Sequence, residues 1–139
     1  MKKLLSALFV IFMVSGCSLI NPDCGIDSVP SDTVYFDYDS SVLKHDAQVT
    51  LTQQLEILTE DDSPIVIEGH ADERGTREYN IGLGARRANE VRNYLLSKGI
   101  EYERMTTISY GKDKPAVEGH DESAWSKNRR AVIYLEDVE

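Results

Sequence analysis

The stretch IVIEGHADERGTREYNIGLGARRANEVRNYLL, residues 65–96, decides the fold, because a strand, a polar loop and a helix follow one another in it. Residues 65–68 form a short run rich in β-branched side chains, and Pro64 ends the loop before them. One face of a helix is then traced, at a spacing of three or four residues, by Ile81, Gly84, Ala88, Val91 and Leu95. Gly99 is placed to end that helix. The sequence therefore predicts a strand with a helix packed against it.

The sequence on either side of this unit predicts three more strands and one more helix. Residues 33–36, 104–110 and 130–135 are rich in β-forming side chains. Ser40 or Ser41 is the expected N-cap of the additional helix. That helix is indicated by the spacing of the apolar residues Ala47, Leu51, Leu55 and Leu58.

A long polar loop separates the last two strands and holds a short helical turn around Ala124 and Trp125. The order of elements is then β-α-β-α-β-β. Each apolar helix stripe and sheet face needs a partner to cover it. The sequence therefore predicts an α/β (α+β) fold, a two-layer sandwich with the helices on one face of a mixed four-stranded sheet.

The N-terminus has the layout of a secretory signal. Two lysines precede an apolar run, residues 4–14, which is too short to span a bilayer stably. Residues 14–17, VSGC, resemble the bacterial lipobox, in which the cysteine is linked to diacylglycerol and becomes the first residue of the mature chain. We expect residues 1–16 to be a lipoprotein signal peptide and Cys17 to be lipidated, with a plain secretory signal as the alternative. Ser18, in place of Asp, suggests sorting to the outer membrane.

The mature chain is expected to hold one folded domain behind a tether. Residues 17–32 carry prolines, a glycine and polar residues without periodicity, which predicts a flexible linker of at most ~50 Å. Residues 33–139 form the expected domain. Removal of the two signal-peptide lysines changes the formal net charge from −9 to −11, which argues against nucleic acid as a partner and against a polybasic membrane contact. Cys24 is a free thiol or part of an intermolecular disulfide, and the free thiol is favoured.

A polar loop with the sequence GHADERG, residues 69–75, connects the central strand to its helix. Loops at the carboxyl end of a strand are the usual place for a binding site in such folds. The free N–H groups at the start of a helix favour an anion, and Arg86 and Arg87 lie farther along the same helix. Taken one at a time, a loop aspartate is more often a turn former, and a surface arginine usually has no specific partner. These residues by themselves predict a polar site without identifying its ligand.

Acid–base or metal chemistry is the main alternative from a different class of function. Glu68, His70 and Asp72 form one cluster of titratable residues, and His120 with Asp121 forms another. No nucleophile lies in a recognisable elbow, and the three histidines lack metal-ligand spacing. We therefore expect no catalysis, no metal and no cofactor.

Three long stretches carry a resemblance to a known family. They are VYFDYDS (34–40), IEGHADERGTREYNIGLGARRANEVRNYL (67–95) and ISYGKDKPAVEGHDESAWSKNRRAVI (108–133). From Tyr35 to its end the chain resembles the OmpA-like C-terminal domain family. With the lipobox included, it resembles more closely the peptidoglycan-associated lipoproteins. The resemblance implies a non-catalytic domain that holds peptidoglycan through the diaminopimelate of the stem peptide.

The resemblance also implies which residues hold the ligand. In the family pattern the aspartate of the loop takes the ligand's ammonium, and an arginine fifteen residues later takes its carboxylate; here these are Asp72 and Arg87. The pattern places around the same pocket Phe36, Asp37, Asn80 and Leu83. An acceptor-only carboxylate and a forked guanidinium suit the free end of diaminopimelate, and they discriminate against plain lysine.

One geometric condition attaches to this site. A straight helix from Thr76 would place Arg87 ~16 Å along its axis, too far from Asp72 to share one ligand head. We therefore expect residues 76 to about 80 to be a loop folded back across the sheet edge. If this segment is a straight helix from Thr76, the site shared by Asp72 and Arg87 is expected to fail. Gly82 and Gly84 are expected to ease the close packing.

The resemblance further implies partners and a location. The stretch SKNRR, residues 126–130, resembles the family's terminal motif, in which Asn128 and Arg129 help to order the binding loops; a simple salt bridge at the sheet end explains the motif equally well. TolB and other Tol-system proteins are the implied protein partners, and they compete with peptidoglycan. The implied location is the outer membrane, with the domain in the periplasm. The alternative is a module mainly for TolB, with weak binding to the wall.

Overall fold

The computed structural model describes residues 31–137, and eight elements follow one another in that part of the chain. They are β1 (Thr33–Tyr35), α1 (His45–Glu60), β2 (Ile65–His70), α2 (Arg77–Ser97), the 3-10 turn η1 (Tyr102–Arg104), β3 (Met105–Gly111), α3 (Glu122–Asn128) and β4 (Arg130–Leu135). The predicted order of strands and long helices is confirmed. The expected signal peptide, Cys17, Cys24 and most of the linker lie outside the described residues. Between residues 31 and 137 no helix has the length and apolar character needed to cross a membrane.

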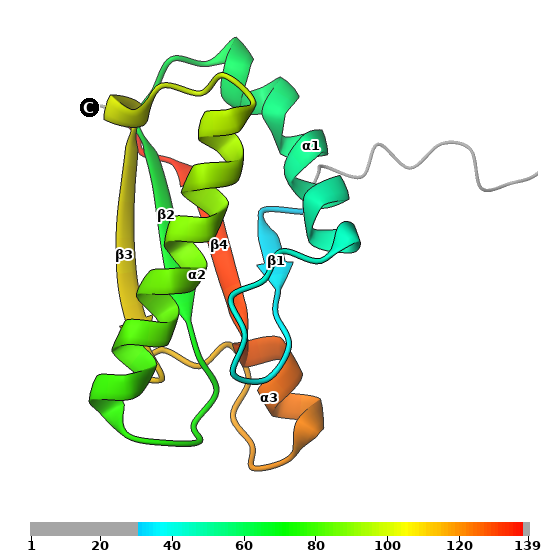
Figure 1. Ribbon diagram of the computed structural model, residues 1–139, viewed down its shortest axis with the longest axis vertical. Coiled ribbons are helices and arrows are strands. Elements are labelled where there is room, and N and C mark those ends of the chain that lie inside the picture. The colour runs from blue at the N-terminus through cyan, green and yellow to red at the C-terminus, as the bar shows by residue number, and fades with distance from the viewer. Residues whose placement is uncertain (1–30, 138–139) are drawn as a thin grey trace, which may run out of the picture.

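The four strands form one mixed sheet in the order β1-β4-β2-β3. Strand β4 is antiparallel to both β1 and β2, whereas β2 and β3 are parallel. Strands β1, β2 and β3 therefore all run in the same direction, and their carboxyl ends meet at one edge of the sheet (Figure 1). This topology brings the loop after β1 next to the loop after β2, although 34 residues of sequence lie between residues 36 and 71.

Both long helices pack on the same face of the sheet, as predicted. Alternate residues of β2, Ile65 and Ile67, are fully buried in a core that they share with both helices. The core also contains Val34, Leu51, Leu58, Ala88, Val91, Leu95 and Ile133. Burying each of the larger side chains contributes about 1.5–3 kcal/mol. This shared core holds α2 over β2 and β3 (Figure 1) and so fixes the helix relative to the loop that precedes it.

Helix α2 lies unusually close to β2 because glycines face each other at the contact. A Cβ added to Gly69 would lie 1.7 Å from the carbonyl oxygen of Gly84, and a Cβ added to Gly84 would lie 2.4 Å from Ser109 Oγ. Gly84 therefore serves close packing as predicted. Gly82 does not, because a Cβ there would meet only Arg86 Nη1, at 3.4 Å.

The start of α2 differs from the prediction. The helix begins at Arg77, so the expected loop over residues 76–80 is wrong. Thr76 is the N-cap, and its Oγ1 accepts a hydrogen bond from the Tyr79 N–H at 3.2 Å. Gly75, with φ of +95°, allows the sharp turn just before it. At the other end the prediction is confirmed, because α2 stops at Ser97 and Gly99 has the left-handed φ of +99°.

The start of α1 also differs. The helix begins at His45, and neither Ser40 nor Ser41 is its N-cap. The Ser40 hydroxyl accepts instead from the Val42 N–H at 3.1 Å, and the Ser40 carbonyl accepts from Arg87 Nε at 2.8 Å. The chain between β1 and α1 is therefore an open loop attached to α2 rather than the first turn of a helix.

Candidate functional site

The loops after β1 and β2 meet the first half of α2 around a cavity of about 210 Å³. Its lining residues are Tyr38, Asp39, Asp72, Arg74, Gly75, Tyr79, Asn80, Leu83 and Arg87. The cavity is smaller than the roughly 300–1,000 Å³ typical of sites for drug-sized ligands. Its size therefore suits a small head group rather than a whole drug-sized ligand.

Asp72 and Arg87 both line this cavity even though α2 is helical from Arg77. The chain leaves β2, travels past the sheet edge through residues 71–75, and turns back into α2 at the lower end of Figure 1. Arg87 Nη1 donates to the His70 carbonyl at 2.8 Å, so the middle of the helix is level with the end of β2. The ~16 Å of rise along the helix is thus compensated by the outward path of the loop. The expected loop at residues 76–80 is not needed for the two side chains to face one cavity.

Arg87 links α2 to the loop after β1 and to the end of β2. Its side chain is fully buried, and its guanidinium donates to three backbone carbonyls: Ser40 at 2.8 Å, His70 at 2.8 Å and Asp37 at 3.0 Å. Its Cζ lies 5.2 Å from the centre of the Phe36 ring. Burial lowers the pKa of Arg87 to about 10, so the group is still a cation at neutral pH. The same residue therefore supplies charge to the cavity and fixes the loop after β1 against β2.

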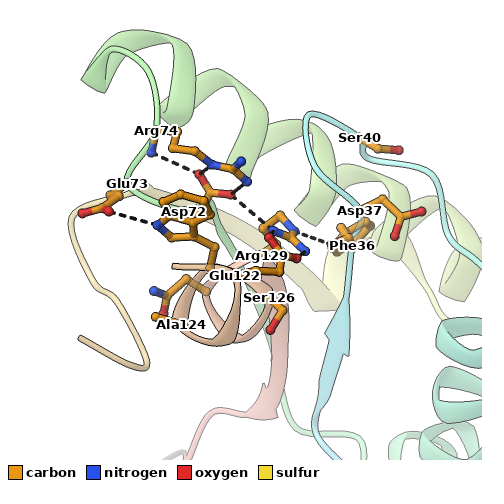
Figure 2. A network of polar contacts seen from close by, with 12 residues as sticks. Phe36, Asp37, Ser40, Asp72, Glu73, Arg74, Glu122, Ala124, Ser126 and Arg129 are labelled. Atoms are coloured by element: carbon orange, nitrogen blue, oxygen red, sulfur yellow. Dashed lines mark hydrogen bonds and ion pairs between the residues drawn. The ribbon is translucent and has the colours of Figure 1, made fainter. Parts of the chain in front are cut away.

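Asp72 is buried, with 4% of its surface exposed, and it is held by Arg74 (Figure 2). Oδ1 accepts from the Arg74 backbone N–H at 3.1 Å and from Nε at 3.2 Å, and Oδ2 accepts from Nη2 at 2.6 Å. Arg129 Nη1 lies 3.6 Å from Oδ2. Burial by itself would raise the pKa of Asp72, but the hydrogen bonds from Arg74 and the two nearby cations outweigh it and lower that pKa. Asp72 is therefore a carboxylate at neutral pH.

The guanidinium of Arg74 lies between two aromatic rings. Its Cζ is 4.0 Å from the ring centre of Tyr38 and 4.0 Å from that of Trp125. Trp125 is in turn fixed by the hydrogen bond from its Nε1 to Glu73 at 2.9 Å, and His120 Nδ1 lies 2.8 Å from the same carboxylate. Figure 2 shows the carboxylates of Glu73 and Asp72 directed to opposite sides of the loop after β2. Residues from the β1 loop, the β2 loop and α3 thus form one polar assembly.

The motif SKNRR, residues 126–130, fixes the loop after β1 and the loop before α3. The Asn128 carboxamide oxygen accepts from the N–H groups of Ala116 and Val117 at 2.7 and 3.0 Å. Arg129 donates to the Phe36 carbonyl at 2.9 Å and pairs with Glu122 at 2.6 Å. The contacts therefore combine the two explanations given for the motif, a salt bridge and the ordering of loops.

Four of the six residues expected around the ligand line the cavity: Asp72, Asn80, Leu83 and Arg87. Phe36 and Asp37 do not. Phe36 is 3% exposed and belongs to the core behind Arg87, and the Asp37 side chain points away and pairs with Lys44 at 3.1 Å.

Five lining residues were not expected around the ligand: Tyr38, Asp39, Arg74, Gly75 and Tyr79. Two of them follow directly after β1, and the rule that sites lie at the carboxyl ends of strands would have indicated them. Asp39 stands at a left-handed position, φ of +49°, and accepts a hydrogen bond from the Tyr79 hydroxyl. This hydrogen bond links the loop after β1 to the first turn of α2.

The titratable residues considered for acid–base chemistry make structural contacts in both clusters. Glu68 lies 3.3 Å from His70 Nε2 and also accepts from the Tyr134 hydroxyl. His120 contacts Glu73, and Asp121 caps α3 by accepting from the Ala124 N–H. Within residues 31–137 no three His, Cys, Asp or Glu side chains are grouped so that they could hold a metal ion.

Comparison with known proteins identifies the family. The model of the OmpA family matches residues 35–129. The chain is 54% identical over 105 residues to the peptidoglycan-associated lipoprotein of Mesorhizobium japonicum, covering 75% of this chain and 62% of that protein. It is 48% identical over 103 residues to the protein of that name from Pasteurella multocida, covering 73% of this chain and 69% of that protein. The match thus spans less than two thirds of the Mesorhizobium relative.

Solved structures agree with this result. The peptidoglycan-associated lipoprotein from Burkholderia pseudomallei superposes with a TM-score of 0.73 at 41% identity, covering 76% of this chain and 91% of that one. The C-terminal domain of MotB from Helicobacter pylori, at 21% identity and a TM-score of 0.70, shares the fold. The chain therefore belongs to the OmpA family and, within it, to the peptidoglycan-associated lipoproteins, a non-enzymatic group.

Proposed function

We propose that this chain is an outer-membrane lipoprotein, anchored through Cys17, that binds peptidoglycan non-covalently through the diaminopimelate of the stem peptide. It thereby links the outer membrane to the cell wall. The observation that carries the proposal is the small cavity that Asp72 and Arg87, which carry opposite charges, both line. The names of its relatives, which associate them with peptidoglycan, support the same ligand.

The free end of diaminopimelate carries an ammonium and a carboxylate on one carbon. Asp72 can only accept hydrogen bonds and suits the ammonium. Arg87 gives three of its five N–H groups to backbone carbonyls, which leaves two for a carboxylate in the cavity. Leu83 and the Tyr79 ring offer apolar surface to the alkyl chain between the two ends of the ligand. The site is thus suited to a zwitterionic head on a short aliphatic stem.

Sedimentation with purified cell-wall sacculi tests this function. The full-length chain in detergent is expected to pellet with diaminopimelate-type sacculi and to stay in solution with lysine-type sacculi. The physical reason is that lysine offers no carboxylate to Arg87, and an unpaired buried partner costs about 1–3 kcal/mol. Free meso-diaminopimelate is expected to release the bound protein.

The control for the anchor uses the same preparation. Cys17→Ala is expected to pellet with sacculi as the wild type does but to leave the membrane fraction. Equal retention on both kinds of sacculi would contradict diaminopimelate recognition, and retention on neither would contradict wall binding.

We also propose that TolB and the Tol system are partners of the same end of the domain, and that the protein acts in envelope integrity and cell division. The membership of the peptidoglycan-associated lipoproteins supports this proposal. So do the exposed rings of Tyr38 and Tyr79, 61% and 48% exposed, at the mouth of the cavity, because exposed tyrosines are common at the centres of protein interfaces.

A competition measurement checks the shared surface. Saturating soluble TolB is expected to displace the chain from diaminopimelate-type sacculi, because a partner covering both tyrosines would close the cavity. If the protein pellets equally with and without TolB, the two partners do not share this surface.

A further inference from the structure

The carboxylate that we assign to the ligand's ammonium already has a cation on it. Arg74 gives Asp72 three hydrogen bonds, of 2.6, 3.1 and 3.2 Å, and Arg129 lies 3.6 Å away. A carboxylate accepts about four hydrogen bonds in all. An incoming ammonium therefore reaches Asp72 only by sharing it with Arg74 or by displacing the guanidinium of Arg74.

A displaced Arg74 would remain beside the ligand. Its guanidinium lies between the rings of Tyr38 and Trp125, each 4.0 Å from its Cζ. Both rings can stack on the guanidinium whether or not its N–H groups are bonded to Asp72. Trp125 is itself held in place through Glu73. The N–H groups freed by the ligand would therefore face the cavity and need an anion.

The charges of the lining residues also indicate that the ligand must bring an anion. Two carboxylates, Asp39 and Asp72, and two guanidiniums, Arg74 and Arg87, line the cavity, so the lining is electrically balanced. Arg129 does not change that balance, because it is paired with Glu122 at 2.6 Å. A ligand with only an ammonium would add one uncompensated positive charge to a partly buried site, whereas a zwitterion would add none.

We propose that Arg74 is a specificity-determining residue: it stands in for the ligand's ammonium on Asp72 and admits only a ligand that brings an anion together with its cation. This inference rests on the proposed binding of a diaminopimelate head. Discrimination against lysine then has two sources. Lysine brings no carboxylate to Arg87, and its ammonium leaves Arg74 without an anion. Without Arg74 the lining would carry one negative charge in excess, and a simple ammonium would become the better match.

The test measures two small probes on the full-length chain in detergent by isothermal titration calorimetry. One probe is meso-diaminopimelate, and the other is Nα-acetyl-L-lysine methylamide, whose only charge is the ammonium. The wild type is expected to prefer diaminopimelate. The preference is the Kd of the lysine probe divided by the Kd of diaminopimelate. Arg74→Gln is expected to reduce this ratio by about tenfold or more, because one charge-assisted contact is removed. Arg74→Lys, which keeps the charge, is expected to stay within about threefold of the wild-type ratio.

Arg77→Gln is the matched control. Arg77 is an arginine in the first turn of α2, paired with Asp113 at 2.7 Å, and it lies outside the cavity lining. Its loss removes the same charge from the protein, so its Kd ratio is expected to remain that of the wild type. Circular dichroism checks that each variant is folded, and Arg74→Met repeats the charge removal if Arg74→Gln does not fold.

The outcomes separate this inference from the proposed function. A wild type that binds neither probe contradicts diaminopimelate binding itself. A wild type that prefers diaminopimelate, with an unchanged ratio in Arg74→Gln or Arg74→Met, leaves the proposed function intact and overturns the role of Arg74. A ratio that falls in Arg74→Lys as much as in Arg74→Gln also overturns it, because the charge would then not be the cause.

Discussion

Asp72→Asn is expected to remove the protein from the pellet of diaminopimelate-type sacculi while leaving it folded. Asparagine has nearly the same shape but no charge, so the ligand's ammonium would be buried without its counterion. Losing one partner of a desolvated charge pair costs about 2–5 kcal/mol, which corresponds to about 30-fold to several-thousand-fold weaker binding. The measurement is the fraction of protein that sediments with sacculi over a range of wall concentrations.

Folding is expected to change little in Asp72→Asn. Asparagine keeps an oxygen that can accept from the Arg74 backbone N–H, which lies 3.1 Å from Asp72 Oδ1, and the Arg74 side chain, 30% exposed, can turn to solvent when its ion pair is lost. Asp113→Asn is the matched control, because Asp113 also pairs with an arginine of the same region but lies outside the cavity. Undiminished sedimentation of Asp72→Asn would show that Asp72 does not receive the ligand.

The elements of the fold were predictable because each depends on a local pattern. Strand β2 starts with a run of β-branched residues, and the apolar stripe of α2 recurs every three or four positions, so composition predicts the strand and periodicity predicts the helix and its buried face. The turn after α2 was predictable for the same reason, since only a residue such as Gly99 adopts its φ of +99° easily. None of these features depends on where distant segments of the chain lie.

The parts that sequence reasoning missed depend on contacts between distant segments. Whether Ser40 caps α1 depends on Arg87, 47 residues later, which takes the Ser40 carbonyl and keeps the loop open. The place of Tyr38 beside Arg74 follows from the strand order, in which β4 inserts between β1 and β2. The wrong expectation of a loop over residues 76–80 also arose from an unknown contact between distant segments. The rise of the helix was correct, but the path of the loop before it was not known.

Arg87 combines a feature that the sequence indicates with one that depends on distant contacts. The family motif indicates it as a ligand contact, and nothing local in the sequence indicates that it is also fully buried. Its three bonds to carbonyls of residues 37, 40 and 70 make it the tie between both site loops and α2. A buried guanidinium is costly unless its N–H groups are satisfied, and these carbonyls supply the partners. The charge that we propose for ligand binding is therefore placed in the site by the same contacts that build the site.

Arg87→Ala is accordingly expected to lower the free energy of unfolding by about 3–5 kcal/mol, because three carbonyls lose their donor and a cavity replaces the side chain. Urea unfolding followed by circular dichroism measures the loss. The neighbouring Arg86 is exposed, so Arg86→Ala is the control and is expected to stay within about 0.5 kcal/mol of the wild type. Equal stability of the two variants would contradict the structural role of Arg87. The expected difference means that lost wall binding in Arg87→Ala reports on folding as well as recognition, whereas Asp72→Asn isolates recognition.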